Sequence, residues 1–360
     1  MKKIKFFFYK FFYLKYGKIK GIRKASNIND ILIKEALLKR NIKKKIYILK
    51  NSRLYTDRIH NLALINRNFL IQGPSYQIIN TNYASCKKNI VLKIGTPRLI
   101  KKIKGKVLSL LSGGGANANY FHWLYDVLPR LKIVETKLSL KQINYLLLPS
   151  VKKKFQRETL RLLGFKNNQF LPSEKYRHIQ SSEIVVSDHP WVNTGNSTRD
   201  ELNIANWIYD WLKLKFLSKI KKKISNNLPK KIFILRKNNF NKNSKNLRFL
   251  KNKREIFKIL KDKRFKFIDL EKYSFLKQVE IFYNAKTIMG VHGAGFANIV
   301  FCKKNTKIFE LKNKETGNLY RNIAIKNGLK YQCLISRIKS FNKSQNGIID
   351  IDIDRLKKLI

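Results

Sequence analysis

The segment TIMGVHGAGFANIVFCKKNTKIFEL, residues 287–311, predicts the architecture of the C-terminal half of the chain. Thr287 to Val291 is typical of a short buried strand, His292 to Gly295 of a tight turn, and Phe296 to Phe301 of the start of a helix. Glycine lets bare backbone approach an anion closely, and a helix N-terminus offers unpaired N–H groups and a positive dipole end. This order therefore indicates a phosphate-binding site with His292 as a further donor, although a lone histidine at a strand end is more often structural.

A second segment, GGGANANYFHWLYDVLPRL at residues 113–131, combines glycines with an almost entirely apolar helix. Between Asn119 and Leu128 the apolar residues cover most of the circumference, which is typical of a buried helix. One polar stripe remains, formed by Asn119, His122 and Asp126 at spacings that place them on one face. Two interpretations fit: an internal hydrogen-bond network, or a cleft in which His122 and Asp126 act as acid and base. A metal site is a weaker alternative because the sequence shows no third ligand.

The C-terminal half alternates expected strands with expected helices. The strands are expected at 230–235, 265–270, 287–291 and 306–311, and the helices at 247–260, 274–285 and 296–301. Such alternation predicts a parallel, doubly wound sheet that binds ligands at the C-terminal ends of its strands. Arg236 follows the first strand, where a guanidinium could pair with a diphosphate, and Glu310 lies near the end of the last.

The motifs, taken in order, resemble glycosyltransferase family 61. The pattern N-Y-x-H-W-x-x-D-x-L-P-R-L begins at Asn119, and H-G-A-G-x-x-N begins at His292. Between them the same resemblance is carried by Arg236 after a strand, by Arg248 to Glu255, and by Ser274 to Gln278. The ordered combination covers residues 113–311 and is far more specific than any single motif.

The resemblance implies an α/β fold of the GT-B type, with two Rossmann-like lobes facing a central cleft. It implies an inverting transferase that moves a hexosyl or pentosyl group from a nucleoside diphosphate sugar to a hydroxyl of a glycan or lipid-linked glycan, in surface polysaccharide (capsule) or lipopolysaccharide assembly. The nucleotide-sugar is a co-substrate, no cofactor is required, and dependence on a divalent metal is left open. The alternatives are a non-catalytic nucleotide-sugar-binding protein of the same fold and a metal-dependent hydrolase that uses His122 and Asp126.

The residues are assigned to these roles as follows. The catalytic base is Asp126 or His122, with the choice left open. Donor binding is assigned to Arg236, His292, Gly293, Ala294, Gly295, Asn298 and Glu310, with Glu310 on the ribose hydroxyls by analogy with GT-B transferases. Supporting roles are assigned to Asn119, Arg130, Arg248 and Gln278, and no residue is assigned to a metal. The Asp350-Ile-Asp352-Ile-Asp354 run has a spacing used by metal-dependent transferases, but it is interpreted as an alternating strand followed by a short helix.

Length and composition set the expected domains. With 360 residues and 44% hydrophobic content, the chain can bury two domain-sized cores. We expect an N-terminal region at 1–105 that belongs to the acceptor lobe, the acceptor lobe itself at 106–212, and a linker at 213–231. The nucleotide-sugar-binding lobe follows at 232–330 and a C-terminal segment at 331–360.

The net charge of +56 would attract anionic membranes, nucleotide-sugars and nucleic acid. Nucleic acid is excluded as a partner because the basic residues are scattered and no nucleic-acid-binding motif is present. Three cysteines without paired spacing predict a reducing compartment. The basic, aromatic segment from Met1 to Lys15 fits neither a signal peptide nor a spanning helix, but could lie in a membrane interface. The expected location is cytoplasmic, peripheral at the inner face of the membrane.

Overall fold

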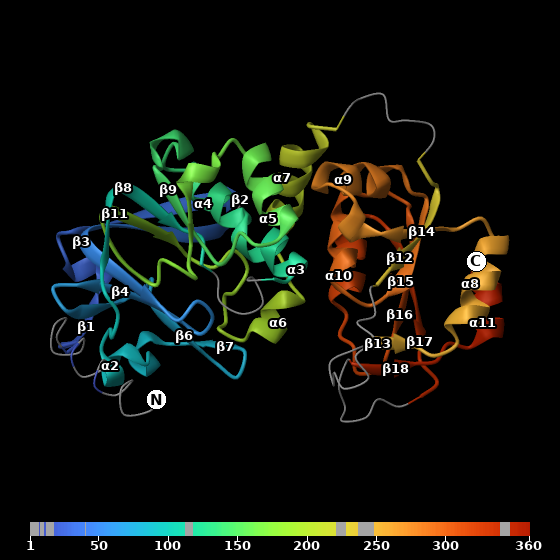
Figure 1. The fold of residues 1–360 in the computed structure, drawn as a ribbon, viewed down its shortest axis with the longest axis horizontal. Helices are drawn as coiled ribbons and strands as arrows, with labels where there is room; N and C mark the ends of the chain where they lie inside the picture. The colour runs from blue at the N-terminus through green and yellow to red at the C-terminus, as the bar shows by residue number, and fades with distance from the viewer. Residues whose placement is uncertain are drawn as a thin grey trace. The chain divides into compact units, whose positions relative to one another are not determined.

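The chain forms two compact units, Met1–Ile208 and Tyr209–Ile360. The structure, a computed structural model, describes residues 7, 11, 18–39, 41–111, 118–220, 228–236, 248–338 and 346–360 (Figure 1). The boundary between the units falls inside helix α7 (Asn206–Leu217), so the predicted linker at 213–231 begins within a helix. The α/β class is confirmed by sheets and helices in both units. The finer domain boundaries stay a prediction.

The N-terminal unit is built on a mixed sheet of eleven strands. Strands β8, β9, β10 and β11 pair in parallel, whereas β2, β3, β4, β6 and β7 form antiparallel pairs and β3 joins the two regions through an antiparallel pairing with β11. A fully parallel, Rossmann-like sheet is therefore not what this unit contains. The strands are β1 (Gly21–Lys24), β2 (Ile31–Lys39), β3 (Ile42–Thr56), β4 (Asn61–Asn66), β5 (Phe69–Gln72), β6 (Tyr76–Ile79), β7 (Asn82–Ala84), β8 (Lys101–Ser109), β9 (Tyr145–Leu148), β10 (Phe170–Pro172) and β11 (His178–Ser187).

Two tight hairpins explain why the antiparallel region is hard to recognise in the sequence. Arg67 and Asn68 connect β4 to β5 with φ values of 46° and 64°, and Asn80 and Thr81 connect β6 to β7 with φ values of 48° and 67°. Positive φ at both central residues is what a two-residue hairpin turn needs to match the twist of its strands. Asn-Gly or Asp-Gly is the usual signal for such a turn, and neither pair contains glycine.

The helix expected between Asn119 and Leu128 is present, with a widened turn in its middle. It consists of α3 (Tyr120–His122), a π-helical segment η4 (Trp123–Val127) and α4 (Pro129–Glu135). The Leu128 N–H donates to the Trp123 carbonyl five residues back, at 3.1 Å. The wide turn immediately precedes Pro129, which has no N–H to donate and whose ring would clash in a regular α-helix. The glycine run at 113–115 lies outside the described residues.

Among the described residues, three further α-helices lie wholly within this unit. They are α2 (Val91–Ile94), α5 (Lys154–Leu162) and α6 (Ser197–Glu201). Trp123 of η4 is fully buried and donates from Nε1 to Thr159 Oγ1 of α5 at 2.8 Å. This bond ties the π-helical segment to the neighbouring helix and fixes the position of the residues around it.

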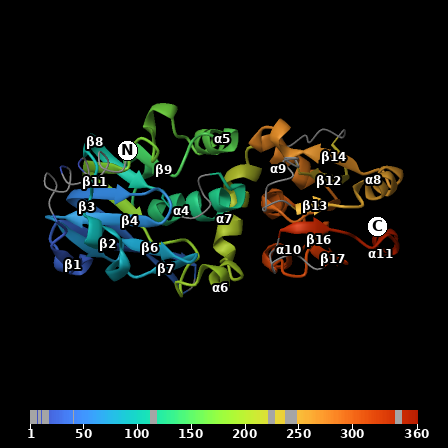
Figure 2. The ribbon, with the colours of Figure 1, turned by 60° about the horizontal axis from the view of Figure 1, so that its bottom comes forward.

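The C-terminal unit contains a fully parallel five-stranded sheet in the order β14-β12-β15-β16-β17. Numbered along the chain, this order is 2-1-3-4-5, the doubly wound order in which ligands bind where the first and third strands meet. Helices α8 and α11 cover one face, and α9 and α10 cover the other (Figures 1 and 2). The elements are β12 (Lys231–Leu235), α8 (Lys253–Asp262), β14 (Lys266–Asp269), α9 (Phe275–Asn284), β15 (Thr287–Val291), β16 (Lys307–Lys312), α10 (Leu319–Lys326), β17 (Lys330–Ile335) and α11 (Ile353–Leu359).

Two local details differ from the sequence-based expectation. The helix expected at 247–260 begins only at Lys253, because residues 248–250 form strand β13 (Arg248–Leu250), which pairs with β18 (Gly347–Ile349). The helix expected from Phe296 is a 3-10 helix, η8 (Ala294–Phe301). The first change lies at the end of a helix, where local sequence preference is weakest, whereas the second affects the whole of η8.

The acidic run at 350–354, interpreted from the sequence as an alternating strand followed by a short helix, has hydrogen-bond partners within the C-terminal unit. Asp350 accepts from Arg337 Nη2 at 3.1 Å, and Asp352 caps helix α11 by accepting the Arg355 N–H at 3.0 Å. The strand ends earlier than expected, because β18 stops at Ile349. These contacts give Asp350 and Asp352 roles in holding the C-terminal segment.

The N-terminal segment from Met1 to Lys15 lies outside the described residues, apart from Phe7 and Phe11. Within the described ranges, no helix combines the length and apolar character that crossing a bilayer requires. Cys86 and Cys302 are buried free thiols, and Cys333 is a half-buried one.

Gly295 is required for packing, and its replacement tests this part of the fold. A Cβ added there would lie 3.0 Å from Leu270 Cδ1 and 3.1 Å from Ile234 Cγ2. We expect Gly295→Val to lower the free energy of unfolding by about 1–3 kcal/mol, because overpacking forces neighbours to shift. Gly317→Val is the matched control, since nothing lies within 4 Å of its added Cβ. Equal urea midpoints for the two variants would contradict this account.

Candidate active site

The carboxylate of Asp126 is the centre of a buried polar cluster in the N-terminal unit. Asp126 is 4% exposed and lies in the π-helical turn η4. Its Oδ2 lies 2.8 Å from His122 Nδ1, and its Oδ1 accepts the Trp191 Nε1–H at 2.8 Å. Both oxygens are therefore held by protein donors, which is how a carboxylate is made tolerable in the interior.

His122 is the member of this pair that a substrate can reach. Its side chain is 27% exposed, against 5% for that of Asp126. The bond to Asp126 assigns the ring proton to Nδ1 and leaves Nε2 as the nitrogen that accepts a proton, the arrangement of a carboxylate-oriented general base. No hydrogen bond to Nε2 is formed within the described part of the chain. The more accessible side chain of the pair is therefore that of His122, with Asp126 behind it holding Nδ1.

A third ionisable group, Glu201, acts on the same pair. Burial raises the pKa of Glu201 to about 7. The charge of His122 lowers this pKa, and the like charge of Asp126 raises it further. Burial also lowers the pKa of His122, but the charge and hydrogen bond of Asp126 and the charge of Glu201 together raise it above its ordinary value. The charges of His122 and Glu201 therefore act on each other's pKa. Glu201 was not predicted from the sequence, because it comes from α6 and no periodicity links it to His122.

A second histidine, His189, lies beside the pair and stays neutral. Its Nδ1 accepts the backbone N–H of Val192 at 3.1 Å, and its Nε2 lies 3.9 Å from Asp126 Oδ2. Burial, followed by the charges of Arg130, Lys44 and His122, lowers its pKa well below the ordinary value. His189 and Trp191 follow strand β11 and were not identified from the sequence.

The remaining sequence-predicted residues of this segment have other roles. Asn119 caps the helix by accepting the Phe121 N–H at 2.9 Å, so it is structural. Arg130 is 2% exposed and donates from Nη1 to the carbonyls of Ser187 and Asp188, at 2.8 and 3.4 Å. Arg130 thus binds the end of strand β11 and the residue after it.

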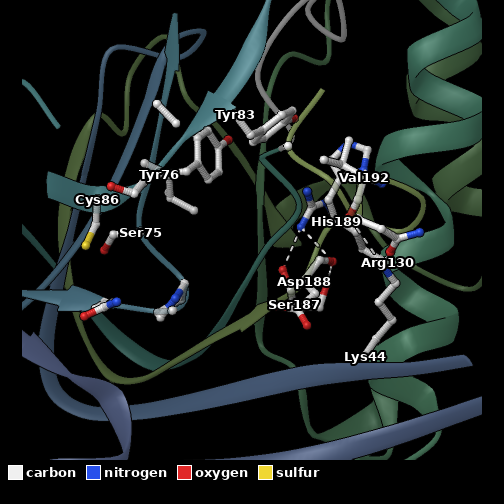
Figure 3. Close-up of a pocket in the computed structure, with 18 of the residues that line it drawn as sticks. Lys44, Ser75, Tyr76, Tyr83, Cys86, Arg130, Ser187, Asp188, His189 and Val192 are labelled. Carbon is white, nitrogen blue, oxygen red and sulfur yellow. Dashed lines mark hydrogen bonds between the residues drawn. The ribbon is translucent and has the colours of Figure 1, made fainter. Parts of the chain in front are cut away.

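Behind His189 lies a pocket of about 540 Å³ (Figure 3). Its wall is formed by strands β3, β6 and β7, by helix α4 and by the segment that follows β11. Lys44, Tyr76, Tyr83, Arg130, Asp188 and His189 are among its lining residues. The pocket therefore shares His189 with the cluster around Asp126.

In the C-terminal unit, two arginines converge on one carbonyl at the switch point of the sheet. Arg236 follows β12 and His292 follows β15, the first and third strands of the sheet. Arg236 Nη1 and Arg248 Nη1 donate to the His292 carbonyl at 3.1 and 2.9 Å. Burial lowers the pKa of both guanidiniums, and the neighbouring charge of Arg236 contributes to lowering that of Arg248 to about 10. Two crowded cations at this position are suited to an anion.

Glu310 has a different position from the one predicted for it. It lies inside β16, is fully buried, and accepts hydrogen bonds from His292 Nδ1 and from the Tyr331 hydroxyl. Both carboxylate oxygens are thereby occupied, so Glu310 orients His292 and does not face a ribose. Burial lowers the pKa of His292 despite the hydrogen bond and charge of Glu310, so this imidazole is neutral at physiological pH.

In the glycine turn and the start of η8, Gly293 is packed against a side chain, whereas two backbone N–H groups have no acceptor. A Cβ at Gly293 would lie 3.2 Å from Arg236 Nη1, so this glycine makes room for the guanidinium. The described hydrogen bonds leave the N–H groups of Ala294 and Gly295 without an acceptor. Asn298, in contrast, is fully buried and donates to Gln278 Oε1 at 3.1 Å.

Asn298, assigned to donor binding from the sequence, and Gln278, assigned a supporting role, form a hydrogen-bonded pair in the interior. Gln278 in turn donates to the Leu270 carbonyl at 2.9 Å, which ties α9 to the segment after β14. Among the described residues, no group of three or more His, Cys, Asp and Glu side chains is arranged to hold a metal ion.

Comparison with known proteins identifies the class of this chain. The family model described as Glycosyltransferase 61 matches residues 120–309, more than half of the chain. A stretch of 65 residues is 34% identical to the EGF domain-specific O-linked N-acetylglucosamine transferase of Drosophila melanogaster, covering 18% of this chain. The match spans only 12% of that protein's length.

The buried role of Glu310 can be tested through Tyr331. We expect Tyr331→Phe to lower the free energy of unfolding by about 1–3 kcal/mol, because one carboxylate oxygen loses its donor in the interior. Affinity of the folded protein for a nucleoside diphosphate should stay within about twofold. If instead urea unfolding is unchanged and nucleotide affinity falls, Glu310 faces the ligand and its positioning role is wrong.

Proposed function

Because the chain belongs to glycosyltransferase family 61, we propose that it transfers a sugar from a nucleoside diphosphate donor to a glycan hydroxyl with inversion at the anomeric carbon. The two units would act as the donor and acceptor lobes of a GT-B enzyme. The observation that carries the proposal is the convergence of Arg236 and Arg248 on the His292 carbonyl at the switch point of a parallel sheet.

The donor diphosphate is assigned to this switch point. Arg236 and Arg248 supply positive charge. The N–H groups of Ala294 and Gly295 at the start of η8 have no protein acceptor among the described residues and would donate to the diphosphate. These groups act most strongly when the bond to the leaving group breaks, because the departing diphosphate gains negative charge at that step. Their contribution is therefore both to binding and to turnover.

The acceptor is activated by His122. In this step the acceptor O–H proton passes to His122 Nε2, the acceptor oxygen bonds to the anomeric carbon, and the bond from that carbon to the diphosphate oxygen breaks. Asp126 stabilises the imidazolium that results, because it already accepts from Nδ1. Inversion requires this base on the face opposite the leaving diphosphate.

The biological setting is proposed from family and charge. We assign the chain to surface polysaccharide or lipopolysaccharide assembly, with a glycan or lipid-linked glycan as acceptor. The net charge of +56 supports a peripheral location at the inner, cytoplasmic face of a membrane, where anionic lipids would attract it. The similarity to an O-linked N-acetylglucosamine transferase makes an N-acetylglucosamine nucleotide the first donor to assay.

The full chain, incubated with a panel of nucleoside diphosphate sugars, tests the proposal. Release of nucleoside diphosphate that rises when a glycan acceptor is added supports transfer. Nucleotide-sugar binding without turnover would instead identify a non-catalytic binding protein. Hydrolysis of glycans that needs no nucleotide and is stopped by a chelator would identify a metal-dependent hydrolase.

Arg236→Gln tests the donor site. Loss of a charge-assisted hydrogen bond is worth about 1.5–3 kcal/mol, so nucleoside diphosphate affinity should fall by roughly 10- to 100-fold. Arg254→Gln is the matched control, because it removes the same charge from an exposed position of α8 in the same unit. Calorimetry with free nucleoside diphosphate measures both. Equal affinities would place the diphosphate elsewhere.

His122→Gln tests the base, and Glu201→Gln tests its environment. We expect His122→Gln to lower kcat by roughly 10²- to 10⁴-fold with donor affinity preserved. A base must be deprotonated, so kcat/KM of the wild type should rise with pH through the raised pKa of His122. Glu201→Gln removes a charge that raises this pKa, so the acidic limb should move to lower pH. If the acidic limb of the kcat/KM profile stays in place in Glu201→Gln, or if His122→Gln keeps full turnover, His122 is not the general base.

A further inference from the structure

The pocket in the N-terminal unit contains two buried cations that have no carboxylate within ion-pair distance among the described residues. Lys44 is 5% exposed and Arg130 is 2% exposed. Lys44 Nζ donates to Asn193 Oδ1 at 2.6 Å, and Arg130 Nη1 donates only to backbone carbonyls. Their partners are neutral, so both charges lie in the interior without a counter-ion in contact.

Arg130 in particular has unused donors. Its Nε is buried and makes no hydrogen bond, and the recorded bonds of the guanidinium all use Nη1. A buried donor without an acceptor costs free energy comparable to a lost hydrogen bond, and a buried charge costs more. Such a group persists where a ligand supplies what the protein lacks.

The surrounding charges keep the pocket positive. Its charged lining residues are Lys43, Lys44, Arg130 and Asp188, three cations and one anion, for a formal charge of +2. Lys43 is exposed and pairs with Glu35 at 3.1 Å, so it needs no ligand. Asp188 accepts the backbone N–H of Lys45 at 2.7 Å. Figure 3 shows Lys44 and Arg130 together on one side of the pocket.

The rest of the lining suits a sugar ring. Tyr76 and Tyr83 lie with their ring centroids 4.9 Å apart, and Tyr83 lies 5.2 Å from the His189 ring. Burial raises the pKa of both tyrosines, so their hydroxyls stay neutral and can donate or accept. Aromatic faces with a few fixed polar groups are typical of a small-molecule site, and about 540 Å³ is within the usual range for one.

We propose that this pocket binds an anionic sugar of the acceptor glycan, with the acidic group on Arg130 and Lys44 and the ring against Tyr76 and Tyr83. The inference rests on the proposed transferase function, because it takes the ligand to be the acceptor. His189 supports this, since it lines the pocket and its Nε2 lies 3.9 Å from the carboxylate that orients His122. The acidic group is a carboxylate or a phosphate, and the two share the chemistry that the cations recognise.

Binding is measured by calorimetry on the full chain without donor, so a failure here is distinct from a failure of transfer. The probes are glucuronate and galacturonate, glucose 6-phosphate and galactose 6-phosphate, with glucose and galactose as neutral counterparts. We expect at least one charged probe to bind at least tenfold more tightly than its neutral counterpart, and the carboxylate and phosphate arms identify the acidic group. No preference for any charged probe would overturn the proposal.

Three variants connect the preference to the pocket. Lys44→Gln should reduce the affinity for the charged probe about tenfold and leave the neutral sugar unchanged. Lys45→Gln removes the same charge from the next residue of β3, which is exposed and outside the lining, and should change neither. Asp188→Asn, measured at about pH 6 where Lys44 keeps its charge even without Asp188, should strengthen binding of the charged probe severalfold, because it removes the anion of the pocket while keeping an oxygen for the Lys45 N–H. This opposite effect keeps the test valid if Lys44→Gln fails to fold.

The pH dependence gives an independent measurement. Burial lowers the pKa of Lys44 to about 8, with Asp188 and Asp200 opposing this effect and Arg130 adding to it. Lys44 loses its charge as pH rises through that value, so affinity for the charged probe should fall between about pH 7 and pH 9. Lys44→Gln should abolish this fall. A free nucleoside diphosphate that binds competitively with the probe and loses affinity in Lys44→Gln would assign the pocket to the donor and overturn the proposal.

Discussion

A carboxylate can be buried only where hydrogen-bond donors surround it, and each unit of this chain meets that constraint with a histidine. Asp126 takes donors from His122 and Trp191, and Glu310 takes donors from His292 and Tyr331. In both pairs the carboxylate holds Nδ1 of the imidazole. The orientation of each histidine is therefore fixed by the folded protein before any substrate is present, which is the precondition for a site that reacts without reorganisation.

The two pairs differ in the exposure of the imidazole and in the direction of its pKa shift, and these differences suit the two histidines to different roles. The His122 side chain is 27% exposed, and nearby acidic groups raise its pKa. The His292 side chain is 9% exposed, and burial lowers its pKa despite Glu310. The first ring is accessible and has a raised pKa, so it is the better placed of the two to take up a proton. The second ring remains neutral. The backbone carbonyl of His292 accepts from Arg236 and Arg248, so this residue brings two positive charges together and carries none itself.

The sequence predicted the parts of these sites that depend on local spacing. His122 and Asp126 are four residues apart on one helix, so their contact follows from helical periodicity. Arg236 and His292 each follow a strand of a parallel sheet, so the switch point could be anticipated as well. Trp191 and Glu201 were not predicted, because they reach Asp126 and His122 through tertiary contacts that no periodicity reveals.

Glu310 shows a different limit. In a parallel strand covered on both faces, alternation does not separate buried from accessible positions, so its burial could not be read from the pattern. The mixed sheet of the N-terminal unit was missed for a related reason. Its hairpin turns use Arg67-Asn68 and Asn80-Thr81 at positive φ in place of a glycine signal.

The high positive charge of this chain is plain in its sequence, but it does not indicate which basic residues bind a ligand. With 78 Lys and Arg residues against 22 Asp and Glu, a cation at any given position carries almost no information about a partner. Most of these charges are solvated, and dissolved ions screen them over about 8 Å at physiological salt. Burial changes this, because a charge held in the interior must be compensated by something nearby. The fold buries Arg53, Arg248 and Lys312 as well as Lys44 and Arg130, but the last two line one pocket together, and Arg130 Nε has no acceptor there. The fold, and not the composition, therefore indicates which positive charges of this protein are placed to meet a ligand.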